Sequence, residues 1–136
     1  MSRIEEMLVT HPKHSRDLGN SILAETLDTL NRCAQICRAC ADACLAEEDV
    51  ASLTICIRTD LDCADVCSTT AAILTRQTDT NWNIVRSQLK TCIQACQICA
   101  AECQQHAYHH EHCRICAEAC AECEQACQQL LGELPA

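Results

Sequence analysis

The chain has 136 residues, and 49% of them are hydrophobic, but sixteen of these are cysteines and only two are aromatic. The length predicts a single domain, and two glycines and two prolines are too few for a loop-rich disulfide scaffold or a many-stranded sandwich. The formal net charge of -9 argues against nucleic acid and anionic membranes as partners, and no apolar run approaches the length of a membrane span. Long helices with a sulfur-rich core are therefore expected.

Residues 1–14 form a short extension in front of the first helical pattern. They include Glu5 and Glu6 and lack an apolar signal-peptide core, a twin arginine and a small-residue cleavage site. We therefore expect a cytoplasmic protein whose thiols are kept reduced.

Helical periodicity predicts four helices, at about 15–47, 50–77, 80–108 and 111–131. The first carries three leucines at helical spacing and then four cysteines spaced 4, 3, 4, which places the cysteines in one narrow stripe. The second helix has the same spacing once Asp60 is added to its three cysteines, and the third helix repeats the 4, 3, 4 spacing. The fourth helix carries five cysteines and is expected to end at Gly132. The stripes comprise Cys33, Cys37, Cys40, Cys44, Cys56, Cys63, Cys67, Cys92, Cys96, Cys99, Cys103, Cys113, Cys116, Cys120, Cys123 and Cys127.

The four stripes belong to an internal repeat. A shift of 59 residues superposes the first stripe on the third, and a shift of 60 superposes the second on the fourth, with Asp60 falling on Cys120. Two related helical hairpins fold most simply as an all-α, antiparallel up-down-up-down four-helix bundle, here a single domain over 1–136 with a cysteine-lined core and a short N-terminal extension.

The two ends of this bundle are expected to differ. Most of the cysteines lie in the half of their helix nearest the first and third connections, and continuing the stripes away from that half gives mostly apolar residues. Continuing the third stripe in the other direction gives His106 and His110, with His109 and His112 close by in the connection. One end should therefore be closed and apolar, and the other open, polar and rich in ligands. The apolar end is expected to comprise Ile22, Thr26, Thr29, Thr70, Leu74, Trp82, Val85, Leu89, Leu130 and Leu134.

Cysteines three and four residues apart on a helix lie close enough for two sulfurs to bind one metal ion. Soft thiolates select Cu(I), zinc or iron–sulfur clusters, and burying about sixteen thiolates requires roughly one monovalent cation per sulfur for neutrality. This charge balance favours a polynuclear Cu(I) store. Core filling, disulfides, a discrete zinc site suggested by the CxxC pairs and an iron–sulfur cluster are the alternatives that the pattern favours less.

The residues also resemble a known family. The CxxxCxxCxxxC stripes from Cys33 and from Cys92, the second-helix series around Asp60 and the QHAYHHEHC turn closely resemble the bacterial copper storage proteins, in particular their cytosolic branch, over residues from about 15 to 131. The resemblance implies a four-helix bundle that assembles as a homotetramer. It also implies many Cu(I) ions inside each bundle, bound mainly by the cysteines and by a few other ligands near the open end.

The sequence thus predicts a non-enzymatic, cytoplasmic copper storage protein that binds multiple Cu(I) ions, of the order of the cysteine count. Copper would pass His106 and His110, with His109 as a further candidate ligand and His112 a weaker one, and would fill the core inward. Asp60 is an accessory ligand, a hard oxygen that interrupts the thiols, or a hydrogen-bonded substitute for cysteine. A zinc-binding or thiol redox and metal-sensing module is the competing hypothesis, and the copper donor and acceptor are not predicted.

Overall fold

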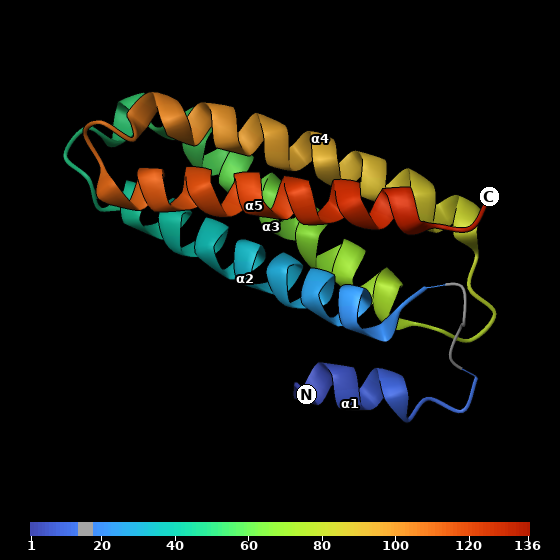
Figure 1. The fold of residues 1–136 in the computed structure, drawn as a ribbon. Helices are drawn as coiled ribbons and strands as arrows, with labels where there is room; N and C mark the ends of the chain where they lie inside the picture. Colours follow the sequence, from blue (N-terminus) through green and yellow to red (C-terminus); the bar gives the residue numbers. More distant parts are fainter. Residues whose placement is uncertain (14–17) are drawn as a thin grey trace.

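The computed structural model describes residues 1–13 and 18–136 of the chain. Within these residues it contains α1 (Arg3–Val9), α2 (Asn20–Leu45), the 3-10 helix η1 (Val50–Ser52), α3 (Thr54–Thr75), α4 (Trp82–His106) and α5 (Glu111–Glu133), and no strand. α2 to α5 run alternately in opposite directions and form the predicted four-helix bundle (Figure 1). Among the described residues, no helix is both long and apolar enough to cross a membrane.

The helix bounds differ from the predicted ones in ways that local chemistry explains. The first long helix starts at Asn20, and residues 15–17 of its predicted range lie outside the described residues. The second predicted helix is divided, because η1 precedes α3 and Leu53 separates them. Gly132 does not end the last helix: α5 continues to Glu133 and stops at Leu134, which is extended because a residue before proline disfavours the helical conformation.

The N-terminal extension contains a helix that the sequence analysis did not predict. The Ser2 side chain caps α1 by accepting a hydrogen bond from the backbone N–H of Glu5 at 3.1 Å, which is the Ser-x-x-Glu capping pattern. α1 lies beside the first half of α2, and Leu8 is the residue that it buries (Figure 1).

The core of the bundle is divided along its length into a sulfur half and a hydrocarbon half, as predicted. All sixteen cysteines are buried, and their stripes run from the end formed by the α2–α3 and α4–α5 connections, which we call the mouth, to just past the middle of the bundle. Ile22 and Thr29 are only partly buried, because α2 turns its leucines inward in their place. Trp82, the first residue of α4, and Leu134, just after α5, are also partly buried. The opposite end is closed by an apolar plug consisting of Leu23, Leu27, Leu30, Leu74, Val85, Leu89 and Leu130.

Candidate metal centre

The sulfur half of the core is a continuous lattice of reduced thiols. The 4, 3, 4 spacing turns every cysteine of α2 to α5 inward, and no cysteine has more than 1% of its surface exposed. Cys67, for example, has its sulfur 3.9 Å from those of Cys63 and Cys92 and 3.8 Å from that of Cys96. These distances are far longer than the roughly 2.05 Å of a disulfide bond. The arrangement therefore supports free thiols and not the disulfide alternative.

The same distances suit bridging metal ions. Two sulfurs that each lie about 2.3 Å from a shared ion are separated by at most about 4.6 Å. The Cys37 and Cys120 sulfurs lie 3.6 Å apart across the bundle, and those of Cys33 and Cys37 lie 4.0 Å apart along one helix. Ions could thus be held both within a helix and between helices.

The same cysteines belong to several groups of potential metal ligands, and this sharing distinguishes a polynuclear cluster from an isolated metal site. Several sets of four ligand atoms lie within 4.8 Å of one another, and many of their members are shared. Cys33 and Cys63, for instance, each belong to two sets. A discrete tetrahedral zinc site would need four ligands of its own. Shared sulfurs are instead the geometry of a polynuclear cluster in which each thiolate bridges two ions. Five of the sets are Cys33, Cys63, Cys67 and Cys96; Cys33, Cys37, Cys63 and Cys120; Cys37, Cys99, Cys116 and Cys120; Cys67, Cys92, Cys96 and Cys123; and Cys40, Cys44, His112 and Cys113.

Asp60 occupies a cysteine position of the lattice and is fully buried. Its Oδ1 accepts hydrogen bonds at 3.2 Å from the thiols of Cys99, Cys103 and Cys116. Its Oδ2 is buried and has no hydrogen-bond partner among the described residues. Burial raises the pKa of the Asp60 carboxyl to about 8. At neutral pH the group is therefore largely uncharged, and one of its oxygens is available to a ligand.

The thiols near the mouth are also shifted from their ordinary acidity. Burial raises the pKa of Cys44 to about 12 and also raises the pKa of Cys113. A hydrogen bond from Cys103 lowers the pKa of Cys56, to about 3. Neutral thiols thus predominate at the two cysteines where desolvation dominates, and a metal ion that binds there must displace protons.

His112 is the histidine that contacts the lattice. Its Nδ1 lies 3.4 Å from the Cys40 sulfur and 3.6 Å from the Cys113 sulfur, and its Nε2 lies 3.1 Å from a carboxylate oxygen of Glu47. If Nε2–H donates to Glu47, the lone pair of Nδ1 faces the two sulfurs, which is how a carboxylate commonly orients a metal-binding histidine. The sequence pattern favours His106 and His110 over His112 as ligands, but in the structure it is the His112 ring that contacts the thiols.

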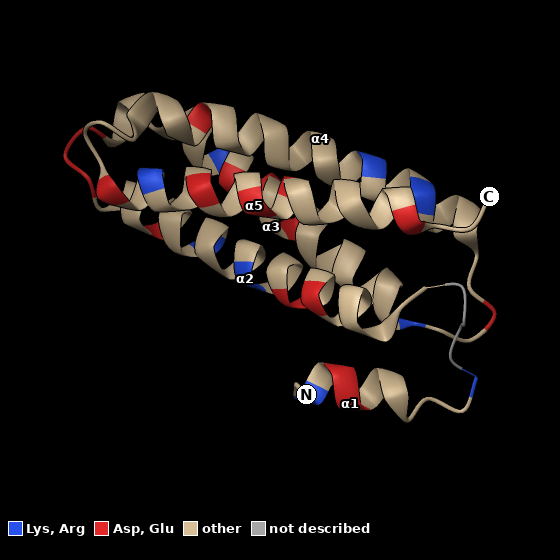
Figure 2. Ribbon diagram, viewed as in Figure 1, with Lys and Arg blue, Asp and Glu red and all other residues tan. Residues whose placement is uncertain are grey.

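The three predicted histidines lie outside the thiol lattice. Both ring nitrogens of His110 contact carboxylates, Nδ1 that of Glu47 and Nε2 that of Asp49 at 3.0 Å, and the Asp49 hydrogen bond raises the pKa of His110. His106 contacts Glu102 at 3.3 Å and is partly buried. His109 is exposed and packs edge-on against Tyr108. Acidic residues gather in the neighbouring α2–α3 loop (Figure 2), so the mouth carries both imidazoles and carboxylates.

Comparisons with known proteins agree with this geometry. The model of the copper storage protein family matches residues 20–132. The structure resembles the copper storage protein Ccsp from Streptomyces lividans loaded with 10 copper equivalents, with 51% identity, a TM-score of 0.94, and coverage of 96% of this chain and 99% of that chain. A second structure, of copper loading (five coppers) to a cytosolic copper storage protein from the same organism, is 56% identical with a TM-score of 0.83 and covers 85% of this chain and 96% of that one. An uncharacterized cysteine-rich protein of Bacillus subtilis (strain 168), YhjQ, is 35% identical over 84 residues, which are 62% of this chain and 72% of that protein.

Proposed function

This chain belongs to the copper storage protein family, and we propose that its sixteen cysteines together form a polynuclear Cu(I) store inside a single-domain bundle. The observation that carries the proposal is the overlap of the four-thiol sets, because sulfurs 3.6 to 4.0 Å apart and shared between sets suit bridged Cu(I) better than separate zinc sites. Storage needs no reaction, so the role is non-enzymatic. The similarity to a cytosolic relative supports a cytosolic location.

Charge balance sets the expected capacity. A core of about sixteen thiolates would be prohibitively charged alone, and roughly one Cu(I) per sulfur neutralises it. Neutral thiols pack as small hydrophobic groups, so the copper-free bundle remains folded. Loading therefore replaces protons with Cu(I) at nearly constant core charge.

The ligand set includes groups other than sulfur. Asp60 is an accessory ligand, since its buried Oδ2 is unpartnered and its Oδ1 contacts three thiols. His112 joins Cys40, Cys44 and Cys113 at the outermost set. His109 stays a prediction, because its exposed ring contacts Tyr108 and none of the thiols that the structure describes.

Copper enters at the mouth. His106 and His110 hold ions transiently among the carboxylates of Glu102, Glu47 and Asp49, and His112 passes them to the first thiols. Filling then proceeds inward, because the apolar plug offers no ligand at the far end. The first cysteines to fill are Cys44, Cys56, Cys103 and Cys113, and the last are Cys33, Cys67, Cys92 and Cys127.

The store is a homotetramer in this proposal. Exposed apolar side chains on the long helices support a subunit contact, among them Ile55, Leu61 and Ile115, which are 57%, 46% and 45% exposed. Native mass spectrometry at micromolar concentration should give the mass of four chains, and a monomer under these conditions would remove this part of the proposal.

An anaerobic Cu(I) titration against a competing chelator tests the store itself. We expect saturation at roughly one ion per cysteine, and loss of about two ions in the variant Cys37→Ser/Cys120→Ser, whose partners are 3.6 Å apart. Ala34→Ser, which adds a hydroxyl at another buried position of α2, serves as the control and should keep full capacity. Saturation at only one or two ions would instead support a sensor or a thiol redox module, and so would extensive oxidation of the thiols in the purified protein.

A further inference from the structure

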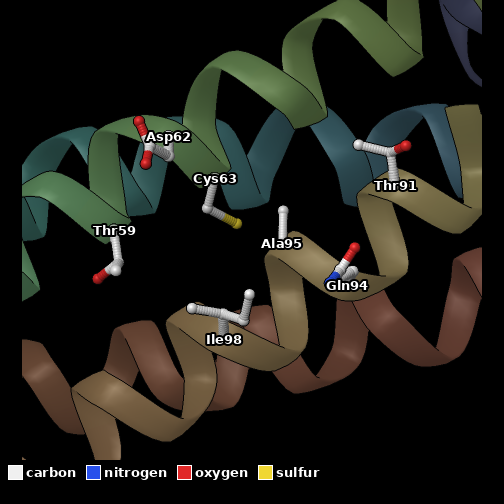
Figure 3. Close-up of a pocket in the computed structure, with 7 residues that line it drawn as sticks. All are labelled: Thr59, Asp62, Cys63, Thr91, Gln94, Ala95 and Ile98. Carbon is white, nitrogen blue, oxygen red and sulfur yellow. The ribbon is translucent and has the colours of Figure 1, made fainter.

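A crevice of about 190 Å³ lies on the side of the bundle, between α3 and α4 and away from the mouth. Cys63 lines its inner part, and its sulfur is directed from α3 toward Ala95 on α4 (Figure 3). Thr59 and Asp62 of α3 and Ile98 of α4 also line it. The crevice thus extends from the outer surface of the bundle to the Cys63 thiol in the middle of the core.

The crevice follows from how the helices pair. α2 packs most closely on α3, and α4 on α5, whereas the α3–α4 and α2–α5 seams are looser. On the α3–α4 seam the short side chains of Thr59, Thr91 and Ala95 leave space above Cys63. The groove on the α2–α5 seam is lined by Thr26, Thr29 and Ala126 among others, and none of its described lining residues is a cysteine. The two seams therefore form a natural pair for comparison.

Cys63 is central to the lattice as well as adjacent to the surface. Its sulfur lies 3.9 Å from those of Cys67 and Cys96, and it belongs to two of the four-thiol sets. It is seven residues from Cys56 at the mouth, or about 10 Å along the helix at 1.5 Å per residue. Among the cysteines, only Cys33 and Cys40 share its residual 1% exposure, and Cys40 lies at the mouth beside His112.

We propose that this crevice is a lateral port through which a low-molecular-weight monothiol reaches Cys63 and exchanges Cu(I) with the middle of the store. The volume is below the roughly 300 to 1,000 Å³ of sites for drug-sized ligands, so it suits a ligand the size of an amino-acid side chain. A thiol matches the soft metal that the core holds. Asp62 at the rim and the net charge of -9 favour an uncharged or cationic thiol over an anionic one.

The exchange is a ligand substitution without electron transfer. The incoming thiol loses its proton and forms a bond from its sulfur to a Cu(I) ion held by Cys63. The bond between that ion and Cys63 breaks, and the Cys63 sulfur takes up that proton. A second incoming thiol displaces the other protein sulfur that shares the ion in the same way, and that sulfur takes up the second proton. Copper leaves as the thiolate complex, and the oxidation states of copper and sulfur are unchanged. Neighbouring thiolates such as Cys67 and Cys96 are close enough to redistribute the remaining ions.

The port itself is tested on the copper-free protein, so that this test does not depend on the storage function. The protein is labelled briefly with iodoacetamide under reducing, anaerobic conditions, and the modified cysteines are identified by peptide mass spectrometry. We expect Cys63 to react well before Cys67 and Cys96. Simultaneous labelling of all three would indicate opening of the whole bundle and would overturn the port.

Filling the crevice gives the matched comparison. Ala95→Leu, and separately Thr91→Leu at an exposed position of the rim, should slow labelling of Cys63 by about tenfold or more while labelling at the mouth is unchanged. Ala126→Leu on the α2–α5 seam is the control and should have no effect on Cys63. Unfolding in urea shows whether each variant is folded. If both crevice variants are folded and Cys63 reacts at the same rate as in the unsubstituted protein, the proposal that the crevice is the route to Cys63 is wrong.

The exchange of copper, which rests on the proposed storage function, is tested on the loaded protein. Cysteamine, a small cationic thiol, should withdraw Cu(I) more slowly, by about tenfold, from Ala95→Leu than from the parent and from Ala126→Leu. Equal rates in all three proteins, together with slowed labelling of Cys63, would show a port that carries no copper and would overturn the exchange. A failure of storage would appear separately, as low capacity in the titration.

Discussion

Replacing Asp60 with asparagine should remove much of the pH dependence of stability in the copper-free protein. Burial raises the pKa of this carboxyl from 3.8 to about 8. Between these values the folded chain keeps a proton that the unfolded chain has lost, so the contribution of Asp60 to stability is present below pH 4 and falls as the pH rises toward 8. The free energy of unfolding changes by about 1.36 kcal/mol per pH unit for one such group, or about 2.7 kcal/mol between pH 5 and pH 7.

Urea unfolding of the reduced, copper-free protein at pH 5, 6 and 7 measures this contribution. Between pH 5 and pH 7 the free energy of unfolding of the unsubstituted protein should fall by about 2.7 kcal/mol more than that of Asp60→Asn, because the amide does not titrate. Taking the difference between the two proteins removes the contributions of other groups, including His110, whose pKa is raised by Asp49. Asp65→Asn, on the same helix but exposed, is the control and should retain the slope of the parent. Parallel pH profiles for the parent and Asp60→Asn would refute the reasoning, since they would mean that Asp60 is ionised inside the core.

Three further outcomes follow from the structure. Loading with Cu(I) at pH 7 should release roughly one proton for each thiol that burial keeps protonated, such as Cys44, measurable by pH-stat; uptake of copper without acid release would contradict this. His112→Ala should slow the first phase of loading in stopped-flow measurements, whereas His109→Ala should not, and equal rates would remove His112 from the pathway. Leu30→Ala in the apolar plug should lower the free energy of unfolding by about 3 kcal/mol in urea while copper capacity stays the same, and reduced capacity would mean that the plug shapes the store.

The fold and the thiol lattice could be predicted because one periodicity controls both. A spacing of 4, 3, 4 places side chains on one face of any straight α-helix, and only a bundle can bury four such faces together. The same rule identified the buried position of Asp60 between Cys56 and Cys63, although it could not show which thiols donate to its oxygen. Those contacts depend on how α4 and α5 are rotated about their axes.

The mouth could not be predicted in the same way, because the helical period ends there. α4 ends at His106, and His110 is the extended residue before α5, so extending the stripe of α4 to His110 had no structural basis. His112 lies in the first turn of α5, one residue before Cys113, and neighbouring helical residues do not normally share a face. Its contact with Cys40 arises from the packing of α5 against α2. The missed helix α1, by contrast, did have a local signal in the Ser2 and Glu5 capping pair.

The division of one bundle into two halves explains how the protein could hold a variable amount of metal without unfolding. The apolar plug contributes burial that is independent of copper, with Leu27, Leu30 and Leu89 almost completely inaccessible. The sulfur half contributes burial as neutral thiols when empty, and as neutral Cu(I)–thiolate units when full. Partial filling is tolerated for the same reason, since each ion that arrives displaces a proton and leaves the core charge nearly constant. A store built from permanently charged carboxylates could not be emptied in this way, because the empty core would repel itself. Asp60, whose raised pKa keeps it largely uncharged at neutral pH, would meet the same requirement as the accessory ligand that we propose.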